Sequence, residues 1–313
     1  MAEEQEKVVT VWVNQPSQSR VSITPDSDAQ LWSTSWEQGD TLGGWSVGGE
    51  SIAQFDMATE VAENGESAIF SGEVESDCEL VLIYPYESAS QVTSAGHYPI
   101  DLARQTVDLA DPYNSMAASK LYMVSDPVAI STDGVAQQPT DMRHMLATLE
   151  IHFTPAENID KSSYEYTLYQ IEVECTNDYT SSSLDLFDTG YIDIAAEGGA
   201  QFCGSTNGSV VVDIENSPLL KYDEEVVIPM VIAPATLVKQ SYITCYLDLT
   251  FRVYRTNIFT GRSYLDECKC RKGFTSNVEF VRGTYNIITA AAGGTLGTGF
   301  SNEDTPSLEV NLN

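Results

Sequence analysis

Apolar and polar residues alternate with a period of two along most of this chain. The longest run spans residues 243–254, where Ile243, Cys245, Leu247, Leu249, Phe251 and Val253 share one face and mostly polar side chains share the other. This pattern predicts a long, half-buried strand. Shorter alternating runs at 9–13, 80–84, 149–153, 169–173 and 308–312, and continuous β-branched runs at 209–214 and 225–229, predict further strands.

Helical periodicity is nearly absent, and the best candidate for a short helix is residues 115–123. Many short strands separated by Gly, Asn, Asp and Ser favour β-sandwiches over alternating strands and helices. The chain has 313 residues, which suits two such domains. Residues 131–141 are polar, turn-rich and without a period, so we expect an all-β chain with an N-terminal sandwich at 1–140 and a C-terminal one at 141–313.

The charge is unusual and disfavours two classes of partner. Forty-six acidic residues against 15 basic ones give a formal net charge of −31. Such a chain repels nucleic acid and anionic membranes. The first residues, MAEEQE, lack the basic and apolar regions of a signal peptide. We therefore expect either a cytosolic protein or the mature part of an exported one.

The six cysteines fall into two groups. Cys78, Cys175 and Cys245 lie on the apolar phase of predicted strands, so we expect core thiols. Cys203, Cys268 and Cys270 lie among Gly, Lys and Arg, in segments that we expect to be loops. If the protein is exported, a disulfide between Cys203 and either Cys268 or Cys270 is predicted.

No catalytic or metal-binding arrangement is predicted. Residues 44–48 (GWSVG) match the nucleophile elbow of hydrolases, but that motif requires a strand before the serine and a helix after it. Here glycines flank a β-rich segment, so we expect a hairpin tip. The three histidines, His97, His144 and His152, show no metal-binding spacing. We predict that the protein is not an enzyme and that it needs no cofactor.

Six short segments together carry a family resemblance. They are 20–23 (RVSI), 36–43 (WEQGDTLG), 68–73 (AIFSGE), 82–86 (LIYPY), 142–151 (MRHMLATLEI) and 281–287 (VRGTYNI). In this order and spacing they resemble the fimbrillin family, the type V pilus subunits and related surface lipoproteins of Bacteroidales. The tryptophan turn, the F-S-G strand and the Y-P-Y strand end are the most specific pieces. Residues 155–275 contribute only strand character.

The resemblance implies a fold and a mode of assembly. The fold is two transthyretin-like β-sandwich domains in tandem, exported as a lipoprotein precursor to the outer membrane. Assembly proceeds through a strand donated between subunits, after a trypsin-like protease removes the first strand. The lipid-bearing cysteine and the signal are missing from this chain, so the export step is an expectation only.

Arg20 is the residue where such processing would occur. It is the only Lys or Arg between Lys7 and Arg104, and polar, turn-prone residues 14–19 precede it. An exposed loop is what a protease requires. Cleavage between Arg20 and Val21 would release the alternating strand at 8–13 and open an apolar groove.

The other end of the chain carries the candidate donor strand. Leu308, Val310 and Leu312 form the apolar phase of a strand predicted at 307–313. A terminal alternating strand can pair at the edge of its own sheet or enter a neighbour's groove.

Two functions from different classes remain open at this stage. The first is a structural pilus subunit, whose partners are other subunits, the processing protease and a host surface protein or glycan. The second is a monomeric surface adhesin or glycan-binding lipoprotein on the same fold, which exposed aromatic side chains clustered in a loop would favour. A hydrolase on a β-sandwich would need a convergent acid–base pair, which the sequence does not indicate.

Overall fold

The structure is a computed structural model of the chain. It describes residues 6–14, 24–26, 31–33, 35–49, 51–58, 66–75, 79–86, 92–93, 95–131, 133–134, 136, 139–155, 162–177, 187–221, 224–237, 245–274, 278–283, 285–291 and 308–311.

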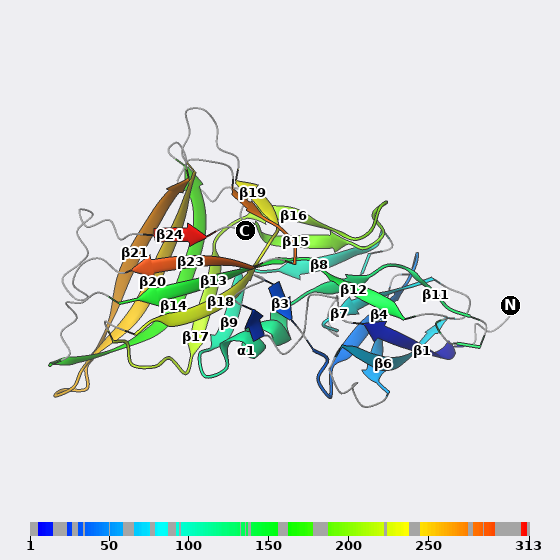
Figure 1. The fold of residues 1–313 in the computed structure, drawn as a ribbon, viewed down its shortest axis with the longest axis horizontal. Helices are drawn as coiled ribbons and strands as arrows, with labels where there is room; N and C mark the ends of the chain where they lie inside the picture. The colour runs from blue at the N-terminus through cyan, green and yellow to red at the C-terminus, as the bar shows by residue number, and fades with distance from the viewer. Residues whose placement is uncertain are drawn as a thin grey trace.

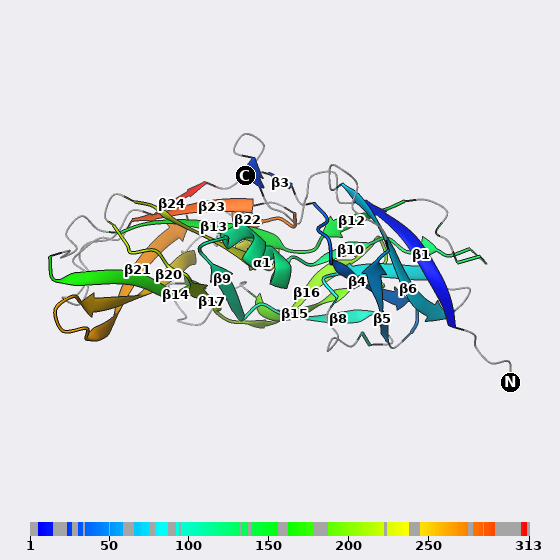
Figure 2. The same cartoon turned by 90° about the horizontal axis from the view of Figure 1, so that it is seen from below.

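The described chain is almost entirely β-structure, as predicted, with one helix, α1 (Pro112–Lys120). Its strands are β1 (Glu6–Asn14), β2 (Thr24–Asp26), β3 (Leu31–Ser33), β4 (Thr41–Ser46), β5 (Ile52–Met57), β6 (Ser67–Glu75), β7 (Glu79–Tyr84), β8 (His97–Asp101), β9 (Arg104–Asp108), β10 (Met123–Ser125), β11 (Val128–Ala129), β12 (Thr140–His144), β13 (Ala147–Thr154), β14 (Tyr164–Asn177), β15 (Phe187–Asp193), β16 (Gln201–Asn207), β17 (Val210–Glu215), β18 (Val226–Ile232), β19 (Ala235–Leu237), β20 (Cys245–Asn257), β21 (Ser263–Phe274), β22 (Val278–Phe280), β23 (Tyr285–Ala291) and β24 (Leu308–Asn311). The body is elongated, with β1, β4 and β6 towards one end and β14, β20 and β21 towards the other (Figures 1 and 2).

The sheet at the N-terminal end closes on itself. Its eight strands run in the order β10-β12-β1-β6-β5-β4-β7-β11, and β10 also pairs with β7. Every strand of this sheet except β11 therefore has at least two neighbours, which is the arrangement of a barrel. Side chains of alternate residues fill its interior, among them Leu42, Phe55 and Leu82, all 0% exposed.

At the other end two sheets face each other. One has the strand order β21-β20-β14-β17-β9 and the other has the order β18-β13-β23-β24. Phe153 of β13 stacks on Phe251 of β20 with ring centroids 4.1 Å apart, which joins the inner faces of the two sheets. The long strand predicted at 243–254 is confirmed as β20, where Leu247, Leu249 and Val253 are buried.

Strand ladders join the two ends of the molecule. β8 pairs with β15, and β9 pairs in parallel with β17, although β8 and β9 precede residue 140 and their partners follow it. The outward faces of β4 and β7 also contribute Trp45 and Val81 to the same buried cluster as Tyr98 of β8 and Ile192 of β15. The segments on either side of the boundary predicted at residue 140 therefore share paired strands and a core.

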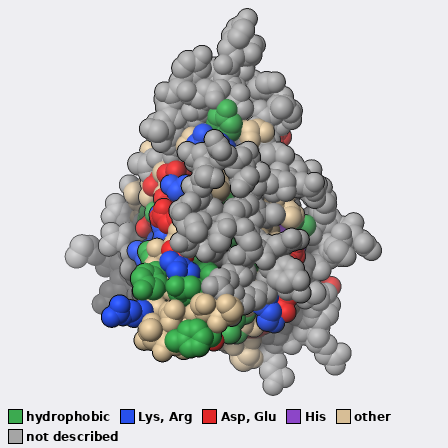
Figure 3. Space-filling view, turned by 90° about the vertical axis from the view of Figure 1, so that its left-hand side faces the viewer, with side chains coloured by type: hydrophobic (Ala, Val, Ile, Leu, Met, Phe, Trp, Pro, Cys, Tyr) green, Lys and Arg blue, Asp and Glu red, His purple; other side chains and the backbone are tan. Residues whose placement is uncertain are grey.

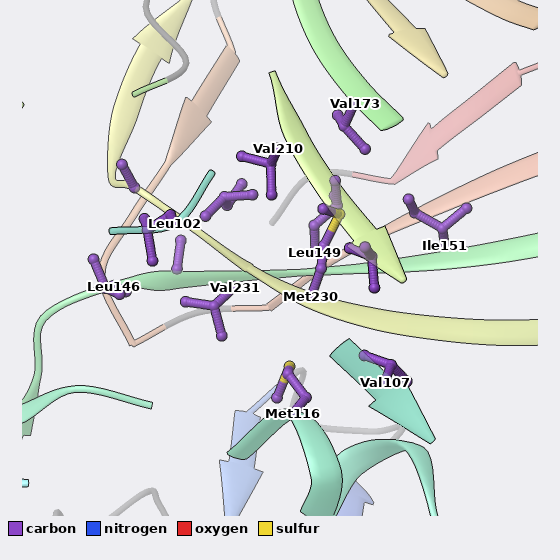
Figure 4. Packing of buried hydrophobic residues seen from close by; sticks show 14 of the residues in the cluster. Leu102, Val107, Met116, Leu146, Leu149, Ile151, Val173, Val210, Met230 and Val231 are labelled. Atoms are coloured by element: carbon purple, nitrogen blue, oxygen red, sulfur yellow. The ribbon is translucent and has the colours of Figure 1, made fainter. Parts of the chain in front are cut away.

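The short helix predicted at 115–123 is present three residues earlier, as α1. Met116 extends from α1 towards Met230 and Val231 of β18, and Val107 of β9 lies beside it (Figure 4). Within the described part of the chain, no helix is both long and apolar enough to cross a membrane.

Candidate assembly site

Strand β1 supplies one side of the barrel core. Its alternation is that of the sequence, since Val9, Val11 and Val13 are 0% exposed while Val8 is 61% and Trp12 51% exposed. Burial of a valine side chain contributes about 1.5–3 kcal/mol, so the three valines together contribute about 5–9 kcal/mol. Without β1, the side chains that these valines cover would face water.

The two edges of β1 are bonded unequally. Along one edge it pairs with β6 in antiparallel register over its whole length, from Glu6 opposite Glu75 to Asn14 opposite Ser67. Along the other edge it pairs in parallel with β12 only at Val13 and Asn14. β1 therefore pairs with a strand along its whole length on one side, and on the other side it pairs with a strand only near its end.

A turn within residues 131–141, the polar segment at the predicted domain boundary, adds two backbone hydrogen bonds to this weaker edge. The amide of Thr10 donates to the Gly134 carbonyl at 2.9 Å, and the Ala136 amide donates to the Thr10 carbonyl at 3.1 Å. Gly134 has φ +84°, and a Cβ at this position would lie 2.6 Å from the Val8 carbonyl oxygen. Only glycine fits there. The Asp133-Gly134 dipeptide is the signal that could have marked the turn.

The most specific pieces of the resemblance converge on β1. Trp36 lies edge-on to Phe70, with centroids 5.0 Å apart, and edge-on to Tyr84, with centroids 5.6 Å apart. All three rings belong to one buried cluster with the β1 valines, and Met142 of β12 completes it. Four segments that are far apart in the sequence thus line the space that β1 fills.

The tryptophan turn holds its shape through Asp40. The Asp40 carboxylate accepts from the Glu37 amide at 2.8 Å and from the Tyr84 hydroxyl at 3.3 Å. Gly39 takes φ +102° between them. Burial raises the pKa of Asp40, although the hydrogen bonds from the Glu37 amide and Tyr84 oppose this. Burial also raises the pKa of Tyr84, so its hydroxyl keeps the proton that it donates.

The predicted processing bond lies outside the described residues. Arg20 and Val21 fall between the end of β1 at Asn14 and the start of β2 at Thr24. Thr24 begins a separate two-stranded sheet with β3. The chain therefore leaves the barrel between β1 and β2, and the predicted bond lies on that connection.

The candidate donor strand is paired within its own chain. β24 is antiparallel to β23, with Leu308 opposite Ala290 and Val310 opposite Ile288. It forms an edge of its four-stranded sheet. Leu312 lies outside the described residues.

The structure corrects the placement of three cysteines. Cys203, Cys268 and Cys270 lie on strands β16 and β21, not in loops, and Cys203 is a free thiol, so the predicted bridge is not formed. Cys268 and Cys270 face Phe251 and Leu249 of β20 and are buried, whereas Lys269 between them is exposed. The charged residues that suggested a loop are the outer face of a period-two strand. Cys175 is buried on β14, as predicted, and Cys78 lies outside the described residues.

The serine motif lies in a hairpin turn, and His97 and His144 make packing contacts or lie partly inside the protein. Ser46 ends β4 in a hairpin to β5, and Gly48 in that turn has φ +87°, which confirms the predicted hairpin tip. His97 stacks on Tyr191 at 4.2 Å. His144 is half-buried, and desolvation lowers its pKa to about 4. Among the described residues, no group of three or more His, Cys, Asp or Glu side chains could hold a metal ion.

Comparison with known proteins gives similarity in structure only. No family model matches the chain. No curated protein matches it either. Similar solved structures include a candidate cell adhesion protein of Bacteroides fragilis (11% identity, TM-score 0.49, covering 97% of each chain) and one of Bacteroides uniformis (13%, 0.45, covering 97% of this chain and 98% of that one). The fimbrial anchor protein Mfa2 of Porphyromonas gingivalis is also similar (10%, 0.35, covering 97% and 98%). At such identities and TM-scores, the function must be argued from the residues of this chain.

Proposed function

We propose that this protein is a structural subunit of a cell-surface pilus of the fimbrillin type. In this proposal a trypsin-like protease cuts after Arg20, β1 leaves, and a strand donated by a neighbouring subunit takes its place. The chain is exported to the outer membrane as a lipoprotein precursor, and its closed N-terminal barrel and its C-terminal pair of facing sheets correspond to the two transthyretin-like domains of that family. Its partners are other subunits, the protease and a host surface protein or glycan.

The observation that carries the proposal is the position of β1. This strand carries Val9, Val11 and Val13 inside the core and is bonded along one edge to β6; on the other edge, the bonds among the described residues are at Val13, Asn14 and Thr10. Its removal would leave a groove lined by Trp36, Phe70 and Tyr84. A donated strand of alternating apolar residues could fill that groove and restore the backbone ladder to β6.

Brief trypsin digestion of the folded protein, followed by N-terminal sequencing, tests the first step. We expect a new terminus at Val21 in the wild type, and an uncut connection in Arg20→Gln. Lys7 lies within the β1–β6 ladder and its ammonium donates to the Ser131 carbonyl at 3.2 Å, so Lys7→Gln serves as a matched control that is still cut after Arg20. An Arg20 bond that stays intact while other bonds are cut would contradict the proposal.

One observation favours the second candidate, a monomeric adhesin or glycan-binding lipoprotein. Tyr254, Phe259 and Tyr264 are exposed around one hairpin, with 38%, 77% and 45% of their surface accessible. Aromatic side chains gathered in this way are typical of a binding surface. What these rings contact is therefore a question separate from strand exchange.

A further inference from the structure

The place that β1 occupies in the barrel has two edges of opposite polarity. β6 runs antiparallel to β1 over its whole length, whereas β12 runs parallel to it at Val13 and Asn14. Backbone hydrogen bonds are slanted and evenly spaced in a parallel pair, and perpendicular and unevenly spaced in an antiparallel pair. A strand in this place therefore meets a different arrangement of donors and acceptors on each side.

Gly134 and Ala136 set the polarity of the edge that faces β12. The Thr10 amide donates to the Gly134 carbonyl at 2.9 Å, and the Thr10 carbonyl accepts from the Ala136 amide at 3.1 Å. Two bonds from one residue to residues two apart are the pattern of a parallel pair. An antiparallel neighbour would require the amide and the carbonyl of Gly134 together, but the Gly134 amide already donates to the Ser131 carbonyl at 2.9 Å.

The backbone of this edge also approaches β1 closely. A Cβ on Gly134 would lie 2.6 Å from the Val8 carbonyl oxygen and 3.0 Å from Lys7 Cε. The Lys7 ammonium in turn donates to the Ser131 carbonyl at 3.2 Å. The turn thus contacts β1 from Lys7 to Thr10, and it does so mainly through backbone groups.

The side chains of β1 do not decide the direction of a strand in this place. Val9, Val11 and Val13 are each 0% exposed, and a row of three alternate valines is the same when it is read from either end. A shift by one residue would instead turn Trp12, which is 51% exposed, towards the core. Alternation therefore sets which face is buried, and the backbone bonds at the two edges set the direction.

We propose that Gly134 and Ala136 select the direction of the strand that replaces β1. The partner is a strand of alternate apolar residues that runs as β1 does, antiparallel to β6 and parallel to β12. It has a backbone amide at the position of Thr10, which excludes proline there. This inference rests on the proposed function, because the place is open only after β1 has left, and it adds the polarity of the partner and the residues that impose it.

A pair of peptides tests the direction. A site-specific protease, whose recognition sequence is inserted between Arg20 and Val21, cuts the full chain without trypsin. Two dye-labelled peptides with blocked ends are compared by fluorescence anisotropy, residues 6–14 in their natural order (EKVVTVWVN) and the same residues in reverse order. Both have the same composition, charge and alternation. We expect the natural-order peptide to replace the cut strand and to bind about 10-fold or more tightly than the reversed one.

The outcomes separate this inference from the proposed function. Equal affinity of the two peptides would overturn the selection of direction and leave strand replacement standing. Binding of neither peptide would overturn both, because the place of β1 would then accept no strand.

Two further comparisons test the role of Gly134. A natural-order peptide that is N-methylated at Thr10 cannot donate to the Gly134 carbonyl, so it should bind about 10-fold more weakly to the unchanged protein. Gly134→Ala should weaken binding of the unmodified peptide to a similar degree. Gly48 has φ +87° against +84° for Gly134, and a Cβ on Gly48 meets nothing within 4 Å, so Gly48→Ala is the matched control. Full affinity of the N-methylated peptide would overturn the role of Gly134.

A last control excludes binding elsewhere. Figure 3 looks onto the end of the molecule that carries β14, β20 and β21, and it shows hydrophobic side chains beside Lys and Arg. β1 lies towards the opposite end (Figures 1 and 2). Phe259, between β20 and β21, is 77% exposed. Phe259→Ser should leave the affinity for the natural-order peptide unchanged, and a loss of binding in this variant would overturn the assignment to the place of β1.

Discussion

The side chain of Gln105 on β9 takes the place of a backbone partner for Val231 on β18. Its Nε2 donates to the Val231 carbonyl at 2.6 Å, and its Oε1 accepts from the Val231 amide at 2.9 Å. Gln105 is 3% exposed and Val231 is 0% exposed. Buried backbone groups require hydrogen-bond partners, so the side-chain amide of Gln105 holds the edge of the four-stranded sheet against the five-stranded one.

Gln105→Ala should lower the free energy of unfolding by about 2–6 kcal/mol. The substitution leaves the buried amide and carbonyl of Val231 unpaired, at about 1–3 kcal/mol each. Urea denaturation measures the change. Gln54 is exposed and bonds only to the Asp56 side chain at 2.7 Å among the described contacts, so Gln54→Ala should stay within about 0.5 kcal/mol of wild type. Equal effects of the two substitutions would show that the Gln105 bonds do not support the sheet edge.

Two valines of β1 provide a matched pair for the barrel core. Val11 is 0% exposed and Val8 is 61% exposed on the same strand. Val11→Ala should destabilise the protein by about 1–3 kcal/mol, since it removes buried methyl groups and leaves a cavity. Val8→Ala should change stability by about 0.5 kcal/mol or less. Thermal or urea unfolding of the intact chain compares the two losses of stability. A larger loss for Val8→Ala than for Val11→Ala would show that the face of β1 with Val11 is not the buried one.

His152 gives the stability a dependence on pH. Its Nε2 lies 2.5 Å from Glu150 Oε1 and its Nδ1 lies 2.7 Å from Glu225 Oε1, while the Tyr113 hydroxyl donates to the other Glu150 oxygen at 2.8 Å. Carboxylates only accept, so the imidazole must be protonated to donate to both. The hydrogen bond to Glu150 first, and then the one to Glu225, raise its pKa above 6.5, against the opposing effect of burial.

Because the folded pKa is the higher one, the stabilisation by His152 is complete below pH 6.5 and is lost as pH rises through the folded value. The stability difference between wild type and His152→Gln should therefore be larger at pH 6 than at pH 9. Urea titrations at the two pH values measure it. A difference that does not change with pH would mean that His152 is not the charged partner of Glu150 and Glu225.

Local patterns in the sequence were enough to predict much of the fold. Alternation of apolar and polar residues is enough to predict the strand β20 and the buried and exposed faces of β1. Turn chemistry accounts in the same local way for the turn around Asp40. The cations Lys269 and Arg271 concealed the strand β21, because the alternation there is between cysteine and cation. The period was present, but the residue types suggested a loop.

The long-range relationships could not be predicted in this way. The pairing of β8 with β15 and of β9 with β17 joins segments about 90 to 110 residues apart, and it leaves no periodic signal in either segment. The pairing of β10 with β7 that closes the barrel likewise joins segments distant in the sequence and leaves no periodic signal. The buried role of Gln105 and the 2.6 Å approach at Gly134 also depend on partners that only the fold brings together.

The cysteines should differ in reactivity according to their strands. Cys203 is a free, half-buried thiol on β16, whereas Cys268 and Cys270 are buried. In the folded protein Cys203 should therefore react with a maleimide before either of the other two. Peptide mass spectrometry after brief labelling measures the order. A peptide in which Cys203 is linked to Cys268 or Cys270 would contradict the free thiol.

The central claim is that loss of the N-terminal strand permits assembly. Negative-stain electron microscopy of the full chain after trypsin treatment tests it most directly, with Arg20→Gln treated in the same way as the control. The account predicts fibres from the cut wild type and none from the variant. Cut wild-type protein that stays as single particles, or fibres that form equally from Arg20→Gln, would contradict it.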